Sequence, residues 1–186
     1  MLRQRAGTRS ALKQFDRAFA DMQEALRLDP ANPFNYTYYA TVLERADSLE
    51  PAIVRARQAV ALDPSFSGFH GELADLLEKA GHMDEALESY RIACEASPSQ
   101  FRYAVYARAL QRARRLDDAL IAARTAAELP GSITGSLNLA RFWLHAGDRD
   151  AARVALRSAI DLGAEPTSLA AAADFRELME DTELNE

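Results

Sequence analysis

Three prolines in this chain, Pro30, Pro64 and Pro98, lie 34 residues apart, and each one ends a closely related segment. A fixed period of this length is typical of helical repeat arrays, in which each short unit packs on its neighbours and no single central core forms. A second set of residues keeps nearly the same period, namely Ala18, Ala52, Ala86, Ala119 and Ala152. The pattern therefore predicts a chain built from about five similar units.

The third unit shows why each repeat should form two helices. Leu73 and Leu77 belong to an apolar stripe at helical spacing, and such a stripe must be buried on a neighbouring helix. Gly81 lies just beyond the stripe, where a residue that accepts a positive φ ends a helix. Asp84 and Glu85 then favour the start of another helix, because their charges complement its positive end. We therefore expect an antiparallel helical hairpin in each unit.

Apolar, small and turn-forming residues recur at matching places in three of the units. In the third unit these are Leu73, Ala74, Leu77, Gly81, Ala86, Tyr90, Ala93 and Pro98. The second unit matches through Tyr39, Ala40, Leu43, Ala52, Ala59 and Pro64, and the fifth through Leu139, Ala140, Trp143, Gly147, Ala152, Leu156 and Ala159. With these residues the chain resembles the tetratricopeptide repeat family over nearly all of its length. The resemblance implies an all-α fold, a right-handed α-solenoid of stacked antiparallel helix pairs.

The same pattern predicts how the chain is divided. We expect a repeat array over residues 1–166, a single capping helix over 167–180 and an acidic tail over 181–186. The cap is predicted from the apolar stripe of Leu169, Ala172, Phe175, Leu178 and Met179. The expected hairpins cover 15–62 for the first two units, then 67–96, 100–129 and 133–162, with Ser132 as the N-cap of the last.

The first unit departs from the pattern, because Arg5 and Arg9 occupy positions where core residues are expected. We therefore expect the residues before Lys13 to be the least protected part of the array. They form a candidate surface for self-association, or for a preceding repeat if the chain is a piece of a longer protein.

Catalytic and metal-binding patterns are weak. His70, His82 and His145 fall in three different repeats without the spacing of metal ligands, and Cys94 is the single cysteine, expected to be buried. The segment 131–136 lacks the lysine and the preceding strand of a phosphate-binding loop, and Trp143 is expected in the core. We expect neither enzymatic activity nor a cofactor or metal.

The net charge of −6 is concentrated at one end, because six acids and one base lie between Asp174 and Glu186. The rest of the chain is close to neutral, which argues against nucleic acid as a partner. No apolar run is long enough for membrane insertion, and the start lacks the apolar region of a secretory signal. The single cysteine favours a reducing compartment, so we expect a cytoplasmic protein, or a periplasmic one if it is excised from an exported chain.

The resemblance to the family also implies a binding surface, because the first helix of each hairpin lines an inner, concave face. By register, the residues of this face are Phe34, Thr37, Tyr38, Thr41, Glu44, Glu72, Asp75, Glu78, Phe101, Val105, Arg108, Arg112, Thr134, Asn138, Arg141 and His145. An aromatic and acidic half thus gives way to an arginine-rich half, which suits a protein or peptide ligand with an acidic segment. The alternative is that these are ordinary solvated helix faces.

Two classes of function remain open at this stage. The first is a binding module or assembly scaffold without chemistry of its own. The second is a repeat domain of a larger enzyme or export machine, such as a glycosyltransferase or a polysaccharide-export protein. One subgroup of the resembled family binds the C-terminal carboxylate of chaperones, but Thr37, Tyr38, Glu72 and Asp75 have the wrong chemistry for that role.

Overall fold

The computed structural model describes residues 1–180, and all regular secondary structure in that range is helical. The twelve helices found there are α1 (Leu2–Ala11), α2 (Phe15–Leu28), α3 (Pro33–Arg45), α4 (Leu49–Leu62), α5 (Ser67–Ala80), α6 (Met83–Ala96), α7 (Gln100–Arg112), α8 (Leu116–Glu128), α9 (Ile133–Ala146), α10 (Arg149–Asp161), α11 (Pro166–Ala171) and α12 (Arg176–Met179). The predicted all-α class is confirmed. The predicted bounds agree with α2 to α10 to within one residue, but the first hairpin begins at Leu2 with α1 and not at residue 15 as predicted.

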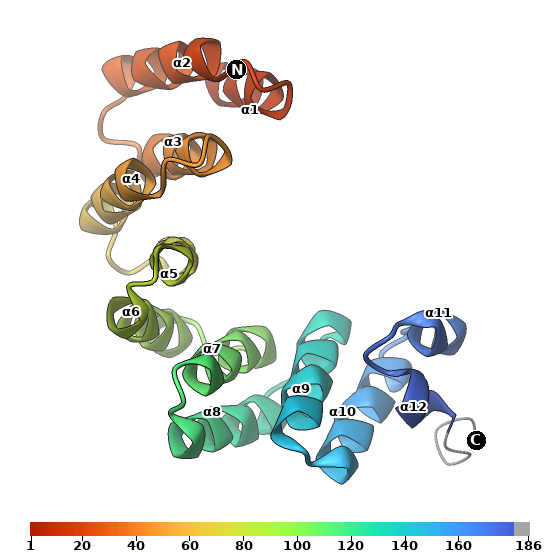
Figure 1. Ribbon diagram of the computed structural model, residues 1–186. Helices are drawn as coiled ribbons and strands as arrows, with labels where there is room; N and C mark the ends of the chain where they lie inside the picture. The colour runs from red at the N-terminus through yellow and green to blue at the C-terminus, as the bar shows by residue number, and fades with distance from the viewer. Residues whose placement is uncertain (181–186) are drawn as a thin grey trace. The chain divides into compact units, whose positions relative to one another are not determined.

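The chain divides into two units, Met1–Ser97 and a second that begins at Pro98. The first unit contains three antiparallel pairs, α1 with α2, α3 with α4 and α5 with α6, stacked in chain order (Figure 1). The second unit contains the pairs α7 with α8 and α9 with α10, followed by α11 and α12. Each unit is thus a stack of helical hairpins, the arrangement that the repeat pattern predicts.

The core alanines hold the two helices of each pair together. Ala18, Ala52, Ala86, Ala119 and Ala152 are all at most 1% exposed. A side chain this small lets the facing helix approach closely, and larger residues such as Leu77 and Leu110, both at most 1% exposed, fill the space beside it. Trp143 and Cys94 are also buried, as predicted.

Every hairpin turn contains one residue in the left-handed region at the same place in the repeat. Gly81 and Gly147 have φ values of 85° and 82° there, in agreement with the helix-ending role predicted for Gly81. Lys13, Asp47 and Arg114 occupy the equivalent position with φ values of 59°, 58° and 60°. The sequence did not reveal this shared geometry, because only two of the five turns carry the glycine that normally signals it.

We predict that Arg114→Gly stabilises the second unit by about 0.5 to 1 kcal/mol, because glycine removes the steric cost of a left-handed L-residue but adds freedom to the unfolded chain. Chemical denaturation is the measurement. Asp47→Gly is the matched control and should gain less, because aspartate tolerates this conformation better than arginine. Equal or lower stability of the Arg114 variant would contradict this account of the turn.

The two arginines at core positions of α1 are paired with a buried carboxylate of α2. Arg5 Nη2 and Arg9 Nη1 lie 2.7 Å and 2.6 Å from the two carboxylate oxygens of Asp21, which is 3% exposed. Hydrogen bonding from Arg5, together with the charge of both arginines, holds the pKa of Asp21 below its usual range. The first unit therefore replaces an apolar contact with an ion-paired one, which the sequence pattern indicated only as two missing core residues.

We predict an asymmetry between the partners of this cluster. The double variant Arg5→Leu, Arg9→Leu leaves the Asp21 carboxylate buried and unpaired, which should cost about 3 to 5 kcal/mol. Asp21→Ala should cost less, about 1.5 to 3 kcal/mol, because the half-exposed arginines can turn into solvent. A triple variant with leucine at all three positions should recover most of the stability. Denaturant unfolding measures all three.

The cluster should also make stability depend on pH. Because the folded-state pKa of Asp21 is lowered, its contribution is present above the unfolded-state pKa of about 3.9 and is lost as pH falls through the folded-state value. The triple leucine variant should lack this part of the acid dependence. A double leucine variant as stable as the parent would show that the ion pairs are incidental.

The prediction of a single capping helix over 167–180 is wrong. The structure has two short helices instead, separated by a turn at 172–175. Leu169 and Phe175 are both buried, yet on a straight helix six residues would place them about 120° apart. With the turn in place, Leu178 and Met179 are buried as well, whereas Ala172 remains partly exposed. The predicted acidic tail, 181–186, lies outside the described residues.

We predict that this segment still acts as a cap of the second unit. Phe175 is fully buried, so Phe175→Ala should cost about 3 to 5 kcal/mol, and loss of the cap should promote aggregation through the exposed side of the last hairpin. Thermal unfolding and sedimentation are the measurements, and Arg176→Ala, at an exposed position, is the control. A Phe175 variant that melts and stays monomeric like the parent would exclude a capping role.

Candidate functional site

The inner face of the first unit contains a small cavity between α3 and α5, of about 80 Å³. Its lining residues are Thr37, Ala40, Thr41, Glu44, Glu72, Asp75, Leu76 and Lys79. Five of these were predicted by register as inner-face residues, so the structure brings together the acidic positions of the second and third repeats. Lys79 was missed, although it lies one helical turn beyond Asp75 on the same face of α5.

Carboxylates outnumber cations around this cavity. Lys79 Nζ donates a hydrogen bond to Glu44, whereas Glu72 has no cation of its own within the described part of the chain. Desolvation by the surrounding protein, with repulsion from Asp75 and Glu44, raises the pKa of Glu72. Desolvation is also the main cause of the raised pKa of Asp75. Ionisation of both side chains is therefore less favourable here than in water, and a nearby positive group would stabilise the ionised forms.

A buried tyrosine contacts two acids of α5, Asp75 in the cavity lining and Glu78 beside it. The hydroxyl of Tyr90 donates to Asp75 Oδ1 at 2.6 Å and lies 2.9 Å from Glu78 Oε2. Tyr90 is 5% exposed, and its burial and acidic neighbours raise its pKa, so the phenol stays neutral. Predicted only as a packing residue, Tyr90 thus also orients the acidic side of the cavity from the second helix of its repeat.

The two threonines at the base of the cavity direct their hydroxyls to their own helix. Thr37 Oγ1 donates to the Phe34 carbonyl at 3.3 Å, and Thr41 Oγ1 donates to the Thr37 carbonyl at 3.1 Å. Thr37 is only 4% exposed. It therefore supports the wall of the cavity, and its side chain offers little surface to a ligand, in contrast to the role predicted for it.

The aromatic residues of α3 are partly covered by their neighbours. The Phe34 ring makes edge contacts with Phe69 at 5.2 Å and with Phe66 at 5.8 Å, between ring centroids, and it stays 44% exposed. The guanidinium of Arg3 lies 5.3 Å from the centre of the Tyr38 ring. Both rings therefore remain available as apolar platforms on one face only.

The predicted site residues of the second unit differ widely in their exposure to solvent. Phe101, Arg112, Thr134 and His145 are exposed, Val105 and Arg108 are half-buried, and Asn138 is buried. The Nδ1 of His145 and the backbone carbonyl oxygen of Arg141 form a hydrogen bond of 2.7 Å. Asn138 was predicted to contact a ligand. Only 8% of this residue is exposed, so the structure does not support that contact.

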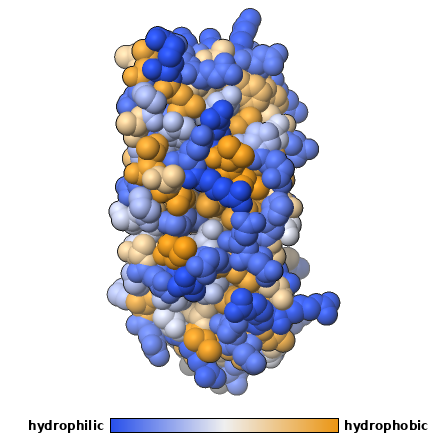
Figure 2. Space-filling model, turned by 90° about the vertical axis from the view of Figure 1, so that its left-hand side faces the viewer, coloured by the Kyte–Doolittle hydropathy of each residue, from blue (hydrophilic) through white to orange (hydrophobic). Residues whose placement is uncertain are grey.

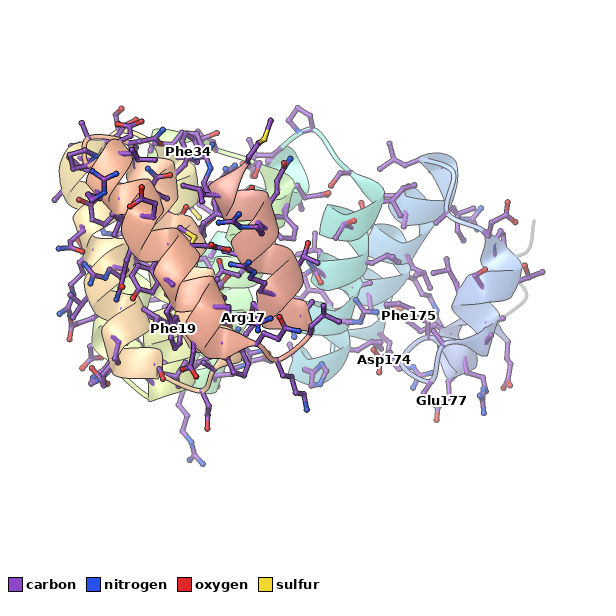
Figure 3. The ribbon with its side chains drawn as sticks, turned by 90° about the horizontal axis from the view of Figure 1, so that it is seen from above. Arg17, Phe19, Phe34, Asp174, Phe175 and Glu177 are labelled. Carbon is purple, nitrogen blue, oxygen red and sulfur yellow. The ribbon has the colours of Figure 1, made fainter. Side chains whose placement is uncertain are left out.

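Arg141 is already bound by the chain's own C-terminal segment. Its Nε donates to Asp174 Oδ2 at 2.8 Å, and its guanidinium lies 5.1 Å from the centre of the Phe175 ring. Asp174 and Phe175 lie together on the segment that joins α11 to α12 (Figure 3). Arg141, predicted as an inner-face residue open to an acidic ligand, therefore already pairs with a carboxylate of its own chain.

The opposite side of the first unit, which carries α4 and α6, is mainly hydrophilic, with separate apolar patches (Figure 2). Among residues 1–180, no group of three or more His, Cys, Asp or Glu side chains is arranged to hold a metal ion. Within the same range, no helix combines the length and hydropathy that crossing a bilayer requires.

Comparison with known sequences and structures finds repeats of a known family in this chain. The tetratricopeptide repeat pattern matches residues 4–32 and 68–100, which correspond to the first and third hairpins. Residues 4–32 and 68–100 are therefore tetratricopeptide repeats. The first match includes Arg5 and Arg9, so the ion-paired first hairpin is itself a repeat of this family. A search of curated proteins finds no match.

Solved structures of tetratricopeptide repeat proteins share the fold. A thermophilic member from Thermus thermophilus is 19% identical, covers 98% of this chain and 97% of its own, and has a TM-score of 0.66. PilF of Pseudomonas aeruginosa is 15% identical with a TM-score of 0.70, over 98% of this chain and 85% of that one. The first repeat domain of Spaghetti (RPAP3), solved with the HSP90 peptide SRMEEVD, is 22% identical, with 64% and 90% coverage and a TM-score of 0.51. Proteins of this family generally act as scaffolds for protein interactions and are typically not catalytic.

Proposed function

We propose that this tetratricopeptide repeat protein is a non-catalytic interaction module that binds segments of other proteins on the inner faces of its repeats. The observation that carries the proposal is the cavity between α3 and α5, with Glu72 and Asp75 held in a desolvated position and only Lys79 among its lining residues to balance them. A lysine or arginine of a ligand would supply the missing positive charge.

The electrostatics favour a cationic ligand group at this position. The raised pKa values of Glu72 and Asp75 mean that each carboxylate is less stable ionised here than in water. A bound ammonium or guanidinium stabilises the ionised forms and so lowers these pKa values. Binding should therefore weaken as pH falls through the raised pKa values, since protonated carboxyls no longer attract the cation. Phe34 and Tyr38 would contact apolar side chains of the same segment.

In the second unit, Arg108 and Arg112 of α7 keep their proposed role as contacts for an acidic part of a ligand, with Phe101 and Val105 on the same helix. Arg141 contributes less in this proposal because it is bound to Asp174, and His145 contributes less because its Nδ1 is hydrogen-bonded to the Arg141 carbonyl. Charge reversal at Arg108 and Arg112 is therefore the cleaner test of that surface. Reversal of Arg141 would also place a carboxylate against Asp174 and disturb the cap.

We predict that the double variant Glu72→Gln, Asp75→Asn binds a fluorescent peptide of alternating glycine and lysine about tenfold more weakly than the parent chain. Fluorescence anisotropy at low and moderate salt measures the affinity, and the difference should shrink as salt rises. The matched control is Asp16→Asn, Glu24→Gln, which makes the same charge change on α2. The melting temperature of the test variant should be equal or higher, because repulsion in the cavity is reduced.

A peptide of alternating glycine and glutamate should not bind this face. If the test and control variants lose affinity equally, only net charge matters, and the inner face of the first unit is an ordinary solvated surface. If the lysine peptide binds the test variant as tightly as the parent, the cavity is not the binding site.

A further inference from the structure

A second kind of groove runs between the second helices of neighbouring hairpins, and each unit contains one. In the first unit it lies between α4 and α6 over α5, with a volume of about 360 Å³. In the second unit it lies between α8 and α10, with Leu139 and Trp143 of α9 as its floor, and has a volume of about 460 Å³. Leu73 and Leu77, equivalent to Leu139 and Trp143 in the repeat, line the groove of the first unit. The two grooves are therefore the same place in two copies of the repeat.

The lining of the two grooves differs in chemistry. Arg57 and Arg124 both lie five residues after the core alanine of their helix, at the rim of each groove. In the first unit, Arg57 Nη2 is 2.5 Å from Glu85 Oε2 across the groove. The residue equivalent to Glu85 in the second unit is Ala151, so Arg124 faces a methyl group where its counterpart faces a carboxylate.

A second replacement makes the groove of the second unit more apolar. Glu88 lines the first groove, and the equivalent residue in the second is Val154, which is 73% exposed. Trp143 and Leu139 on the floor are 8% and 3% exposed. In addition, α8 packs less closely on α9 than α4 packs on α5. An exposed valine beside a tryptophan-lined hollow is the kind of surface that protein partners cover.

Gln100 and Ser158, two polar residues that line this groove, already have partners. Gln100 Oε1 accepts hydrogen bonds from the Ser132 amide at 3.0 Å and from Ser136 Oγ at 3.3 Å, and Ser136 Oγ also lies 3.2 Å from Ser158 Oγ. Within the described part of the chain, neither Arg124 nor Glu128 on the rim has an ion-pair partner. Two charges on the rim are therefore available to a ligand, Arg124 and, one helical turn further along, Glu128.

We infer that the groove between α8 and α10 is a second interaction surface, which binds a partner segment that presents a large apolar side chain and a carboxylate. The apolar side chain packs on Leu139 and Trp143 beside Val154, and the carboxylate pairs with Arg124 as Glu85 pairs with Arg57. Glu128 opposes a second acid one turn further along, so the segment carries a single acid near its apolar residue. The proposal is independent of the inner-face site, because it uses other helices and the opposite charge.

The same chain supplies the variants that test this. Ala151→Glu should rebuild across this groove the ion pair seen in the first unit, and so compete with a ligand carboxylate without unfolding the hairpin. Arg124→Glu removes the attraction and repels the ligand. Glu85→Ala, in the first unit, is the matched control that alters the equivalent position of the other groove.

The probe is a phage-displayed library of random twelve-residue peptides. It is panned on the full chain that carries Glu72→Gln and Asp75→Asn, so that peptides specific for the inner-face site are not enriched. Enriched peptides should share a large apolar residue with an aspartate or glutamate within one helical turn. As synthetic peptides they should bind Ala151→Glu and Arg124→Glu about tenfold more weakly, and Glu85→Ala unchanged, by fluorescence anisotropy. Thermal unfolding checks that the variants are folded.

Several results would overturn the inference. Enriched peptides without an acid, or peptides that bind Ala151→Glu as tightly as the parent, would exclude the pairing with Arg124. If the same peptides are enriched on a chain that also carries Ala151→Glu, the groove is excluded as the peptide site. A parent chain that is a dimer by sedimentation and becomes monomeric with Ala151→Glu would assign the groove to a second copy of this chain in place of a partner.

Discussion

The close approach of two helices at one alanine per hairpin is the contact on which the other features depend. Ala18, Ala52, Ala86, Ala119 and Ala152 are almost completely buried, and a larger side chain at any of them would push the paired helices apart. Because this contact recurs with the period of the sequence, the rest of each repeat is held in register. Inner-face residues such as Glu72 and groove residues such as Arg124 then take equivalent places in successive hairpins.

Polar groups in the packed regions are accommodated by partners from the opposite helix. Asp21 is tolerated inside the first hairpin because Arg5 and Arg9 both reach it from α1. The Tyr90 hydroxyl reaches Asp75 and Glu78 from α6 and so connects the core to the inner face. In both cases the charge is acceptable only as part of a satisfied cluster, which is why removing one member is expected to cost more than replacing all of them.

The equivalence of the repeats makes differences between them informative. An arginine at the same position meets a glutamate in the first unit and an alanine in the second, and a neighbouring glutamate becomes an exposed valine. Hairpin stacking by itself permits either chemistry, since both grooves lie over the same kind of packed floor. The apolar surface at Ala151 and Val154, in place of charge, therefore distinguishes the grooves of the two units.

The amino-acid sequence alone determined the repeat, the bounds of every hairpin but the first and most of the buried residues, because period, apolar stripes and turn residues act over short distances that a sequence displays directly. It also placed Glu44, Glu72 and Asp75 on one inner face through register. Tertiary structure alone decided which charges meet. Arg5, Arg9 and Asp21 are up to sixteen residues apart, and Arg141 and Asp174 are further still, so no local pattern reveals these pairs. The break at 172–175 likewise belongs to the tertiary structure, in which Leu169 and Phe175 are both buried although a straight helix would place them about 120° apart.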